Sequence, residues 1–368
     1  MRAVPAVFAR IEGGDYEQVV FCQDRSSGLR AIVAVHSTRL GPALGGARFS
    51  AYTDEDEALD DALRLARAMT YKAALAGLDL GGGKAVILGH PATDKNEALL
   101  RAFGRHVDAL GGRYVTAEDV GTSQADMDLL REETAHVTGT SPARGGSGDP
   151  SPATAEGLLW AMRAVSARLW GTTALTGSHV VIAGMGKVGT HLAEGLVREG
   201  ASLTVADVVG ARVDDAVERF GATPVPPEKA HAVECDVFSP CALGGALGPT
   251  TIGELRCQAV VGAANNQLAD GTHAEALVDA GVLYAPDYAV NAGGLINIAE
   301  ELRPGGWRPD RGRAAVARVF ETTTRVLDLA DAESVTPAAA ADLLAERRLA
   351  AAAGTPWLRL RALSGGAS

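Results

Sequence analysis

The stretch that decides the fold is Ser178-His-Val-Val-Ile-Ala-Gly-Met-Gly-Lys-Val-Gly189. A short apolar run leads directly into the pattern Gly-x-Gly-x-x-Gly, and the sequence beyond it predicts a helix to about Glu199. A second apolar run, Ser202–Ala206, then ends at Asp207. This acidic residue follows the first glycine at about the 20-residue spacing of dinucleotide-binding βαβ units. Together the strand, loop, helix and acid predict a Rossmann domain.

Each residue of this loop has a distinct mechanical role. Gly184 permits the tight turn, Gly186 lets the backbone approach a pyrophosphate, and Gly189 allows close packing of helix on strand. The free N–H groups of the helix N-terminus then attract the phosphates. Asp207 can accept hydrogen bonds from ribose hydroxyls and would repel a 2′-phosphate, so NAD is favoured as cofactor. Arg212 lies near enough in sequence to keep NADP as an alternative.

Composition bounds the class of protein. The chain has 368 residues, of which 47% are hydrophobic and 21% charged, which predicts one or two domains with a substantial core. The net charge of −11 argues against nucleic acid or an anionic membrane as partner. The 44 glycines and 5% aromatic residues suggest a backbone that approaches a ligand closely in several places. The four cysteines lack disulfide or metal spacing, and no metal site is expected. With no signal peptide and no apolar span, we expect a cytoplasmic protein.

The expected organisation is α/β with two domains around a cleft. Strands and helices alternate through the first part, which predicts a mainly parallel substrate-binding sheet over residues 1–149. The Gly-, Pro- and Ser-rich segment 139–152 predicts a hinge, and the Rossmann domain is expected over residues 150–327. The alanine-rich segment 328–368 is expected to pack back on the first domain.

Two lysines near glycine clusters are candidate functional residues. Lys84 follows Gly81–Gly83, but Leu78 and Ala85 rule out a P-loop at this position. Asp149 similarly rules out a nucleophile elbow around Ser147, because Gly-x-Ser-x-Gly needs a glycine there.

Lys72 shares a predicted helix face with Leu65 and Met69, where a solvated surface charge is the alternative interpretation. The pair Glu118-Asp119 stands at the carboxyl end of a predicted strand, which is where open α/β sheets bind ligands.

Several motifs occur in order along the chain and together resemble the Glu/Leu/Phe/Val dehydrogenase family, the leucine and valine dehydrogenases most. They are Leu40–Arg48, Met69–Ala74, Leu80–Lys84, Thr116–Thr122, Ser151–Gly157, Gly184–Gly189, Asn265–Leu268 and Pro286–Leu295. The resemblance covers about residues 30–305. It implies reversible oxidative deamination, in which an L-amino acid, NAD and water give a 2-oxo acid, ammonium and NADH.

The resemblance also implies roles for individual residues. Lys84 would activate the water that attacks the imine, Asp119 would shuttle a proton at the substrate nitrogen, and Lys72 would bind the substrate carboxylate. Asn266 would help to hold that carboxylate. The expected substrate-binding set is Lys72, Gly45, Gly46, Met69, Leu44, Ala117, Thr138, Asn266, Leu295 and Ile298. The expected cofactor set is Thr154, Gly184, Met185, Gly186, Lys187, Val188, Gly189, Asp207, Cys241, Ala242, Ala263, Asn265 and Asn291.

Apolar residues at the expected pocket wall favour a branched-chain substrate. Glutamate-specific relatives carry a lysine in place of Leu44 and a hydroxyl in place of Ile298, so a γ-carboxylate would find no partner. Ala117, Thr138, Leu295 and Ile298 predict a small apolar pocket suited to valine, leucine and isoleucine. Valine is expected to be preferred because the chain is similar overall to the alanine- and arginine-rich members of the family. A phenylalanine or glutamate dehydrogenase is the alternative, followed by a non-enzymatic NAD-binding sensor. A homo-oligomer is expected, with the first-domain strands and C-terminal helices as contact surfaces.

Overall fold

The computed structural model describes residues 7–242 and 244–352, which form two compact units. Of the described residues, those from 7 to 149, from 298 to 308 and from 345 to 352 belong to the first unit. Pro150–Asn297 and Pro309–Leu344 form the second. This division differs from the expected one, because residues 328–344 pack in the second unit and 298–308 in the first. Residues 353–368, also expected on the first domain, lie outside the described residues.

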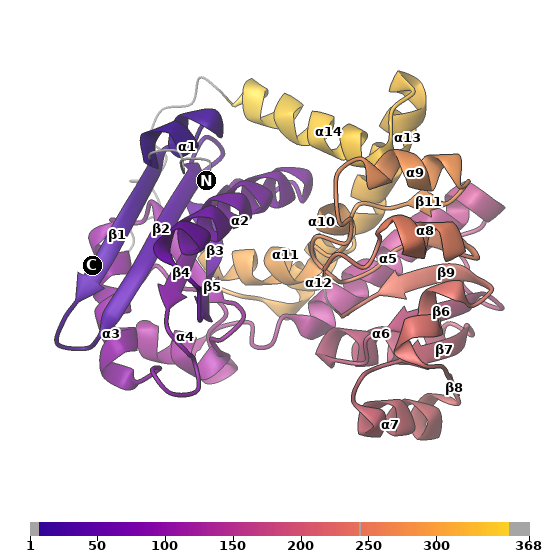
Figure 1. Cartoon of the computed structure of the whole chain (residues 1–368), viewed down its shortest axis with the longest axis horizontal. Helices are drawn as coiled ribbons and strands as arrows, with labels where there is room; N and C mark the ends of the chain where they lie inside the picture. The colour runs from indigo at the N-terminus through magenta and orange to yellow at the C-terminus, as the bar shows by residue number, and fades with distance from the viewer. Residues whose placement is uncertain (1–6, 243, 353–368) are drawn as a thin grey trace. The chain divides into compact units, whose positions relative to one another are not determined.

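The first unit is built on a five-stranded sheet with the order β1-β2-β4-β3-β5 (Figure 1). β3 runs parallel to both β4 and β5, whereas β1–β2 and β2–β4 are antiparallel. The sheet is therefore mixed, where the sequence predicted a mainly parallel one, because the first two strands form a hairpin. The strands are β1 (Gln18–Asp24), β2 (Leu29–Ser37), β3 (Ala43–Ser50), β4 (Gly81–Leu88) and β5 (Tyr114–Glu118).

Helices cover both faces of this sheet. Ile32 and Ala34 of β2 pack against α2, while their neighbours Ala31 and Val33 face α3 and α4, as the two-residue period of a strand requires. The predicted cap of α2 is confirmed, since Asp54 Oδ1 accepts from the Glu57 N–H at 2.8 Å. The helical elements of this unit are α1 (Val7–Gly13), α2 (Glu55–Leu75), α3 (Glu97–Ala109), α4 (Gln124–Leu130), η1 (Pro142–Arg144) and η3 (Glu300–Leu302).

The second unit is built on a parallel sheet with the order β11-β10-β9-β6-β7-β8. The chain begins at β6, winds outward through β7 and β8, and returns to β9 on the other side, which is the doubly wound Rossmann topology. The predicted Rossmann fold is confirmed. The strands are β6 (His179–Ala183), β7 (Ser202–Ala206), β8 (Thr223–Pro224), β9 (Cys235–Pro240), β10 (Cys257–Val260) and β11 (Leu283–Tyr284).

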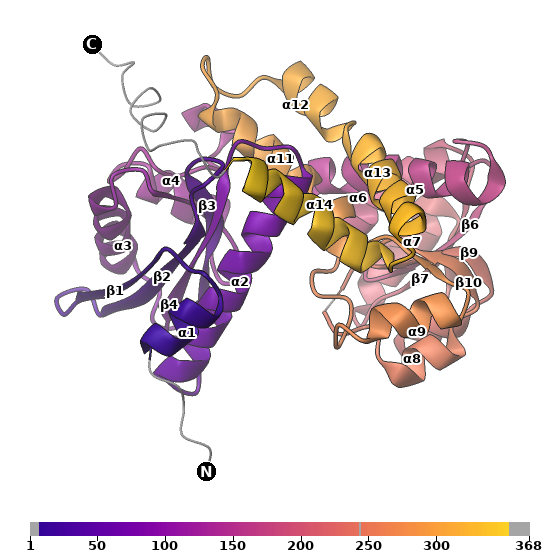
Figure 2. The same ribbon diagram turned by 90° about the horizontal axis from the view of Figure 1, so that it is seen from above.

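The helices of the second unit lie on both faces of this sheet. α5, α6 and α13 pack together on one face, and α8 and α9 lie beside each other on the opposite face (Figure 2). The helical elements are α5 (Ser151–Trp170), α6 (Lys187–Arg198), α7 (Gly210–Phe220), η2 (Pro227–Ala232), α8 (Pro249–Glu254), α9 (His273–Asp279), α10 (Asp287–Val290), α11 (Gly293–Ala299), α12 (Pro309–Val316), α13 (Val319–Glu333) and α14 (Pro337–Ala351). Among the described helices, none has the length and apolarity needed to cross a membrane.

Candidate active site

A buried lysine and an aspartate meet over the strand β3 in the first unit. Lys84 lies on β4 and Asp119 directly follows β5, so the two residues come from the strands that flank β3. Lys84 Nζ donates to Asp119 Oδ2, and the side chains are only 4% and 18% exposed. A Cβ at Gly46 would lie 2.8 Å from Asp119 Cβ and 3.1 Å from Oδ2. The absence of a side chain on β3 at this point leaves room for the pair.

The electrostatics of the pair favour an ionised carboxylate. Burial by itself raises the pKa of Asp119, but the cationic groups of Lys84 and Arg48, together with the hydrogen bonds from Lys84 and the Val120 N–H, outweigh it and hold the pKa below its usual value. Asp119 is also held through its backbone, because its N–H donates to Thr122 Oγ1 at 2.8 Å. The result is a fixed, charged acceptor beside a buried ammonium group.

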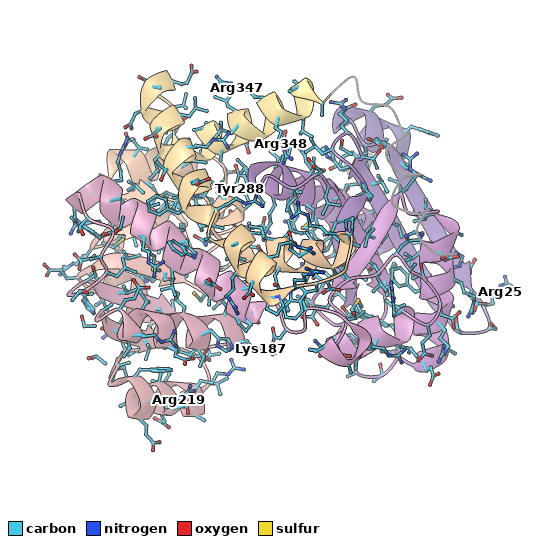
Figure 3. The ribbon with its side chains drawn as sticks, turned by 180° about the vertical axis from the view of Figure 1, so that it is seen from behind. Arg25, Lys187, Arg219, Tyr288, Arg347 and Arg348 are labelled. Atoms are coloured by element: carbon cyan, nitrogen blue, oxygen red, sulfur yellow. The ribbon has the colours of Figure 1, made fainter. Side chains whose placement is uncertain are left out.

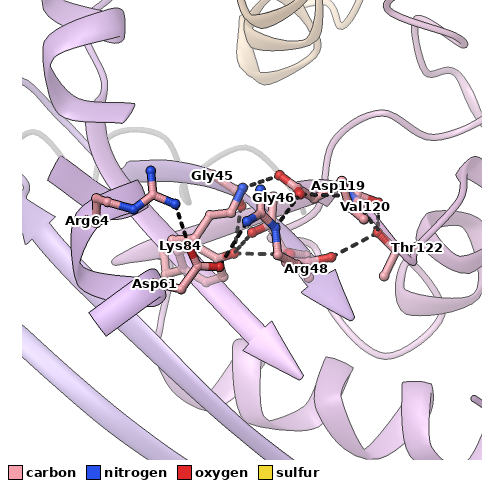
Figure 4. A network of polar contacts seen from close by, with 12 residues as sticks. Gly45, Gly46, Arg48, Asp61, Arg64, Lys84, Asp119, Val120 and Thr122 are labelled. Atoms are coloured by element: carbon pink, nitrogen blue, oxygen red, sulfur yellow. Dashed lines mark hydrogen bonds and ion pairs between the residues drawn. The ribbon is translucent and has the colours of Figure 1, made fainter. Parts of the chain in front are cut away.

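Arg48 connects this pair to the helix α2 (Figure 4). Its Nε lies 3.1 Å from Asp119 Oδ1 and its Nη1 lies 2.9 Å from Asp61 Oδ2. Tyr52 and Arg64 also donate to Asp61, at 2.9 and 2.6 Å. The sequence analysis did not single out Arg48 or Asp61, although Arg48 ends the quoted motif Leu40–Arg48.

The glycines around the pair have a packing role that composition did not reveal. A Cβ at Gly45 would overlap the carbonyl of Gly83, and one at Gly82 would overlap Thr70 of α2. These positions therefore allow neighbouring strands and the helix to approach within the unit. Thr70 is fixed in turn by His36, whose Nδ1 lies 2.8 Å from Thr70 Oγ1.

The remaining predicted substrate residues of the first unit fall into two groups. Leu44 and Thr138 are fully buried and Ala117 is 4% exposed, and all three lie on or beside β3 and β5. Met69 and Lys72 are half-buried on α2. The carbonyls that end α2 at Ala73 and Ala74 accept from Arg348. Ile298 is half-buried and belongs to the first unit, whereas Asn266 and Leu295 belong to the second.

The predicted cofactor residues lie at the carboxyl ends of the strands in the second unit. Gly184 follows β6 and packs against Ala242 beyond β9, at the point where the strand order reverses. A Cβ at Gly186 would meet nothing within 4 Å, so the backbone at the start of α6 faces open space. Lys187 is the first residue of α6 and is exposed (Figure 3). A parallel sheet binds ligands at such a switch point.

Asp207 lies at the end of β7, as predicted, and contacts the glycine loop. Its Oδ2 accepts from the Met185 N–H at 2.7 Å, and its Oδ1 accepts from the Val209 N–H at 2.8 Å. Arg212 Nη1 lies 3.5 Å from the same Oδ1. The carboxylate therefore shapes the loop directly, in addition to any contact with a ligand.

Two asparagines lie beyond β10 and α10 in the same unit. Asn291 Nδ2 donates to the Ala263 carbonyl at 3.0 Å and to Asn265 Oδ1 at 2.9 Å. Asn291 Oδ1 is buried and has no hydrogen-bond partner among the described residues. Thr154 Oγ1 donates to the Pro150 carbonyl at 3.1 Å, and a Cβ at Gly294 would lie 2.6 Å from the same Oγ1. Asn266 has a φ of 53°, which is uncommon for a residue other than glycine.

A fully buried glutamine missed by the sequence analysis holds these loops in place. Gln267 Nε2 donates to the Gly262 carbonyl at 2.8 Å and to the Ala264 carbonyl at 3.0 Å, and its backbone N–H donates to Asp287 Oδ2. In the sequence, the feature that could have pointed to Gln267 is its place in the motif Asn265–Leu268. Among the described residues, no group of three or more His, Cys, Asp or Glu side chains could hold a metal ion. Burial raises the pKa of the Cys241 thiol.

A doubly wound sheet with a glycine loop at its switch point is typical, as a class, of dinucleotide-binding proteins. The chain belongs more particularly to the Glu/Leu/Phe/Val dehydrogenase family, as the sequence motifs predicted. The family description "Glu/Leu/Phe/Val dehydrogenase, dimerisation domain" matches residues 16–136, and "Glutamate/Leucine/Phenylalanine/Valine dehydrogenase" matches residues 209–353. The protein is an amino acid dehydrogenase, and enzymes of this family use a nicotinamide cofactor.

Named relatives are similar over nearly the whole chain. Leucine dehydrogenase of Geobacillus stearothermophilus is 50% identical over 93% of this chain and 93% of its own length. Valine dehydrogenase of Streptomyces albus is 51% identical over 92% of this chain and 93% of its own length. The crystal structure of L-tryptophan dehydrogenase from Nostoc punctiforme has a TM-score of 0.82 at 38% identity, covering 94% of this chain and 99% of that one.

Proposed function

We propose that this enzyme catalyses the reversible NAD-dependent oxidative deamination of a branched-chain L-amino acid, with valine preferred and leucine and isoleucine accepted. The products are the 2-oxo acid, ammonium, NADH and a proton, with water consumed. The observation that carries the proposal is the buried pair of Lys84 and Asp119. The names of the leucine and valine dehydrogenases that resemble the chain support the same substrate class.

The residues of the first unit perform the acid–base chemistry in this proposal. Lys72 binds the substrate carboxylate, and Asp119 takes a proton from the substrate nitrogen. The ammonium group of Lys84 stabilises charge that develops when water attacks the imine carbon, which is how a fixed cation lowers such a barrier. The attacking water gives up one proton to solvent as the C–O bond forms. Asp119 then returns its proton to the amino nitrogen, the C–N bond breaks as the hydroxyl becomes the carbonyl of the 2-oxo acid, and the departing ammonia takes up the hydroxyl proton to leave as ammonium.

The second unit offers a fitting site for NAD. The open backbone at Gly186 and the N-terminus of α6 suit the pyrophosphate, and Asp207 suits the ribose hydroxyls. The unpartnered Oδ1 of Asn291 would accept from the carboxamide N–H of the nicotinamide, and Thr154 would help to hold the ring. When bound, the nicotinamide accepts a hydride from the substrate Cα. Asn266 contributes to holding the substrate carboxylate in this proposal.

The pocket wall supports a small apolar side chain as substrate. Leu44, Ala117 and Thr138 are buried and bear no charge that could pair with a γ-carboxylate. One methylene changes such a preference by about 1–3 kcal/mol, so valine, leucine and isoleucine should differ only moderately in kcat/KM.

The deciding experiment is a panel of initial rates with each L-amino acid, with NAD or NADP, followed by NADH or NADPH absorbance. We expect valine, leucine and isoleucine with NAD to give the highest kcat/KM. Preference for glutamate, phenylalanine or tryptophan would refute the substrate assignment. A protein that binds NADH but turns over none of the amino acids would instead be a sensor.

The catalytic assignment has its own test. Lys84→Ala removes the ammonium group from the pair, and we expect kcat to fall by about 10²–10⁴-fold. NADH binding, measured by fluorescence, should stay within about twofold because the loop of Gly184–Gly189 is in the other unit. A kcat near that of the unaltered enzyme would refute the role of Lys84.

We also propose that the enzyme forms a homo-oligomer through its first unit. β1 is an edge strand whose outer hydrogen-bonding groups pair with no other described strand, and its Phe21 side chain is 56% exposed. An edge of this kind is a natural pairing site for a second chain. Light scattering of the purified protein tests this, and a monomeric mass would refute it.

A further inference from the structure

Charged side chains alternate in sign from the buried lysine to the surface of α2. The order is Lys84, Asp119, Arg48, Asp61 and Arg64, and each member contacts the next (Figure 4). The two ends of the series differ in exposure: the Lys84 side chain is 4% exposed and that of Arg64 is 54% exposed. Only the first two members have a role in the proposed chemistry, so the function of the others is open.

Arg48 divides the two oxygens of Asp119 between different partners. Oδ2 is contacted by Lys84, whereas Oδ1 accepts from Arg48 Nε at 3.1 Å and from the Val120 N–H at 2.7 Å. A carboxylate held at one oxygen by two donors cannot rotate to exchange its oxygens without losing both bonds. Oδ2 therefore stays on the side of Lys84.

The guanidinium group of Arg48 is itself held in place. Its Nη1 lies 2.9 Å from Asp61 Oδ2, which also accepts from the Tyr52 hydroxyl. A guanidinium presents several donors in one rigid plane, so it can contact Asp119 and Asp61 at the same time. A lysine at this position would retain the charge but could not reproduce both contacts with one nitrogen.

We propose that Arg48 is a positioning residue for the reaction: it holds Oδ1 of Asp119, so that Oδ2 alone serves Lys84 and the substrate nitrogen. This inference rests on the proposed proton-transfer role of Asp119. It goes beyond that role, because Arg48 acts through Asp119 and touches no reacting atom.

The charges that face Asp119 support this assignment. Lys84 on β4 and Arg48 on β3 are the cations, while Asp61 lies behind Arg48 on α2 and Tyr114 is a neutral neighbour on β5. Burial raises the pKa of Asp119, but the two cations, together with the hydrogen bonds from Lys84 and the Val120 N–H, lower it more than burial raises it. Losing one cation should therefore raise this pKa, since an opposite charge nearby is worth about 1–3 pH units.

The test compares three variants of the full-length enzyme over a range of pH. Arg48→Gln removes the positive charge and the planar guanidinium group, whereas Arg48→Lys keeps the charge and removes only the guanidinium group. Arg64→Gln is the control, because Arg64 contacts Asp61 but not Asp119. The readout is the pH profile of kcat/KM for deamination, which reports the free enzyme's essential groups. NADH binding and thermal unfolding establish that each variant is folded.

We expect Arg48→Gln to move the acid limb of the profile upward by about one pH unit or more and to lower kcat by about 10–100-fold. Arg48→Lys should keep the acid limb near its original pH but still lower kcat by about tenfold. Arg64→Gln should leave both unchanged. An unshifted acid limb in folded Arg48→Gln would overturn the proposal. Should that variant not fold, full kcat in Arg48→Lys would overturn it equally.

A fourth variant separates this proposal from the function on which it rests. Asp119→Asn keeps the shape of the side chain and removes its charge, and we expect kcat to fall by at least about 100-fold. If Asp119→Asn is fully active, the proton-transfer role of Asp119 is wrong. If Asp119→Asn is inactive while Arg48→Gln behaves as the unaltered enzyme does, only the positioning role of Arg48 is wrong.

Discussion

Two glycines of the same loop should respond to alanine in opposite ways. A Cβ at Gly184 would lie 2.7 Å from Ala242 N and 2.8 Å from Ala242 Cβ, and the φ of this residue is 116°. A Cβ at Gly186 would meet nothing within 4 Å, and its φ of −74° suits any residue. The pair therefore separates the glycine required for folding from the glycine required for binding.

The magnitudes follow from these contacts. Gly184→Ala must displace β9 or the loop by several tenths of an ångström, and overpacking of this kind costs about 1–3 kcal/mol. The unfavourable backbone conformation adds about 1–3 kcal/mol, so we expect the second unit to lose about 2–6 kcal/mol of stability. Gly186→Ala should change stability by no more than about 0.5 kcal/mol. Its methyl group would nevertheless occupy the space into which a pyrophosphate must approach, and should weaken NADH binding at least about tenfold.

Urea unfolding followed by circular dichroism measures the change in stability, and NADH fluorescence titration measures the change in affinity for NADH. Equal unfolding midpoints for Gly184→Ala and the unaltered enzyme would refute the packing argument. Unchanged NADH affinity in Gly186→Ala would show that the phosphates do not bind at the start of α6. A loss of stability in Gly186→Ala as large as in Gly184→Ala would refute the separation itself.

Three further predictions concern single side chains. Burial, assisted by Arg67, lowers the pKa of His36 to about 4, so its contribution to stability is complete above pH ~6.5 and is lost as the pH falls to about 4. The loss is at most about 3 kcal/mol, and His36→Asn should flatten the pH dependence of unfolding, whereas parallel curves would contradict this. Asp207→Asn removes the charge that repels a 2′-phosphate and should lower the ratio of kcat/KM for NAD over NADP at least about tenfold, which an unaltered ratio would disprove. Tyr288→Phe removes the 2.6 Å hydrogen bond from Tyr288 (labelled in Figure 3) to Asp342 and should cost about 1–3 kcal/mol, so an unchanged unfolding midpoint would count against it.

Local patterns were enough to predict much of the fold. The order strand, glycine loop, helix and acid around Gly184 and Asp207 predicted the Rossmann unit because each part depends on residues adjacent in sequence. The mixed character of the first sheet was not predictable in the same way. Whether β2 pairs with β4 in parallel or antiparallel depends on the route of the chain between them. The alternation of apolar residues along each strand does not reveal that route.

The candidate site likewise combines residues that the sequence pointed to with contacts that only the fold creates. The residue types of Lys84 and Asp119 and their motifs marked them as candidates from the sequence, but their contact depends on β3 lying between β4 and β5. Arg48 and Gln267 became visible only in the folded chain, because each acts by bridging segments that are distant in sequence.

The abundance of glycine shows the same distinction most clearly. By itself the sequence determined that the chain is an α/β dehydrogenase with a dinucleotide loop, because those signals are local and ordered. Only the tertiary structure decided what each glycine does: Gly45 and Gly82 give space to neighbouring backbone and helix, whereas Gly186 faces open space. The physical reason is that the room for a Cβ is set by atoms from elsewhere in the chain, whose positions exist only after folding.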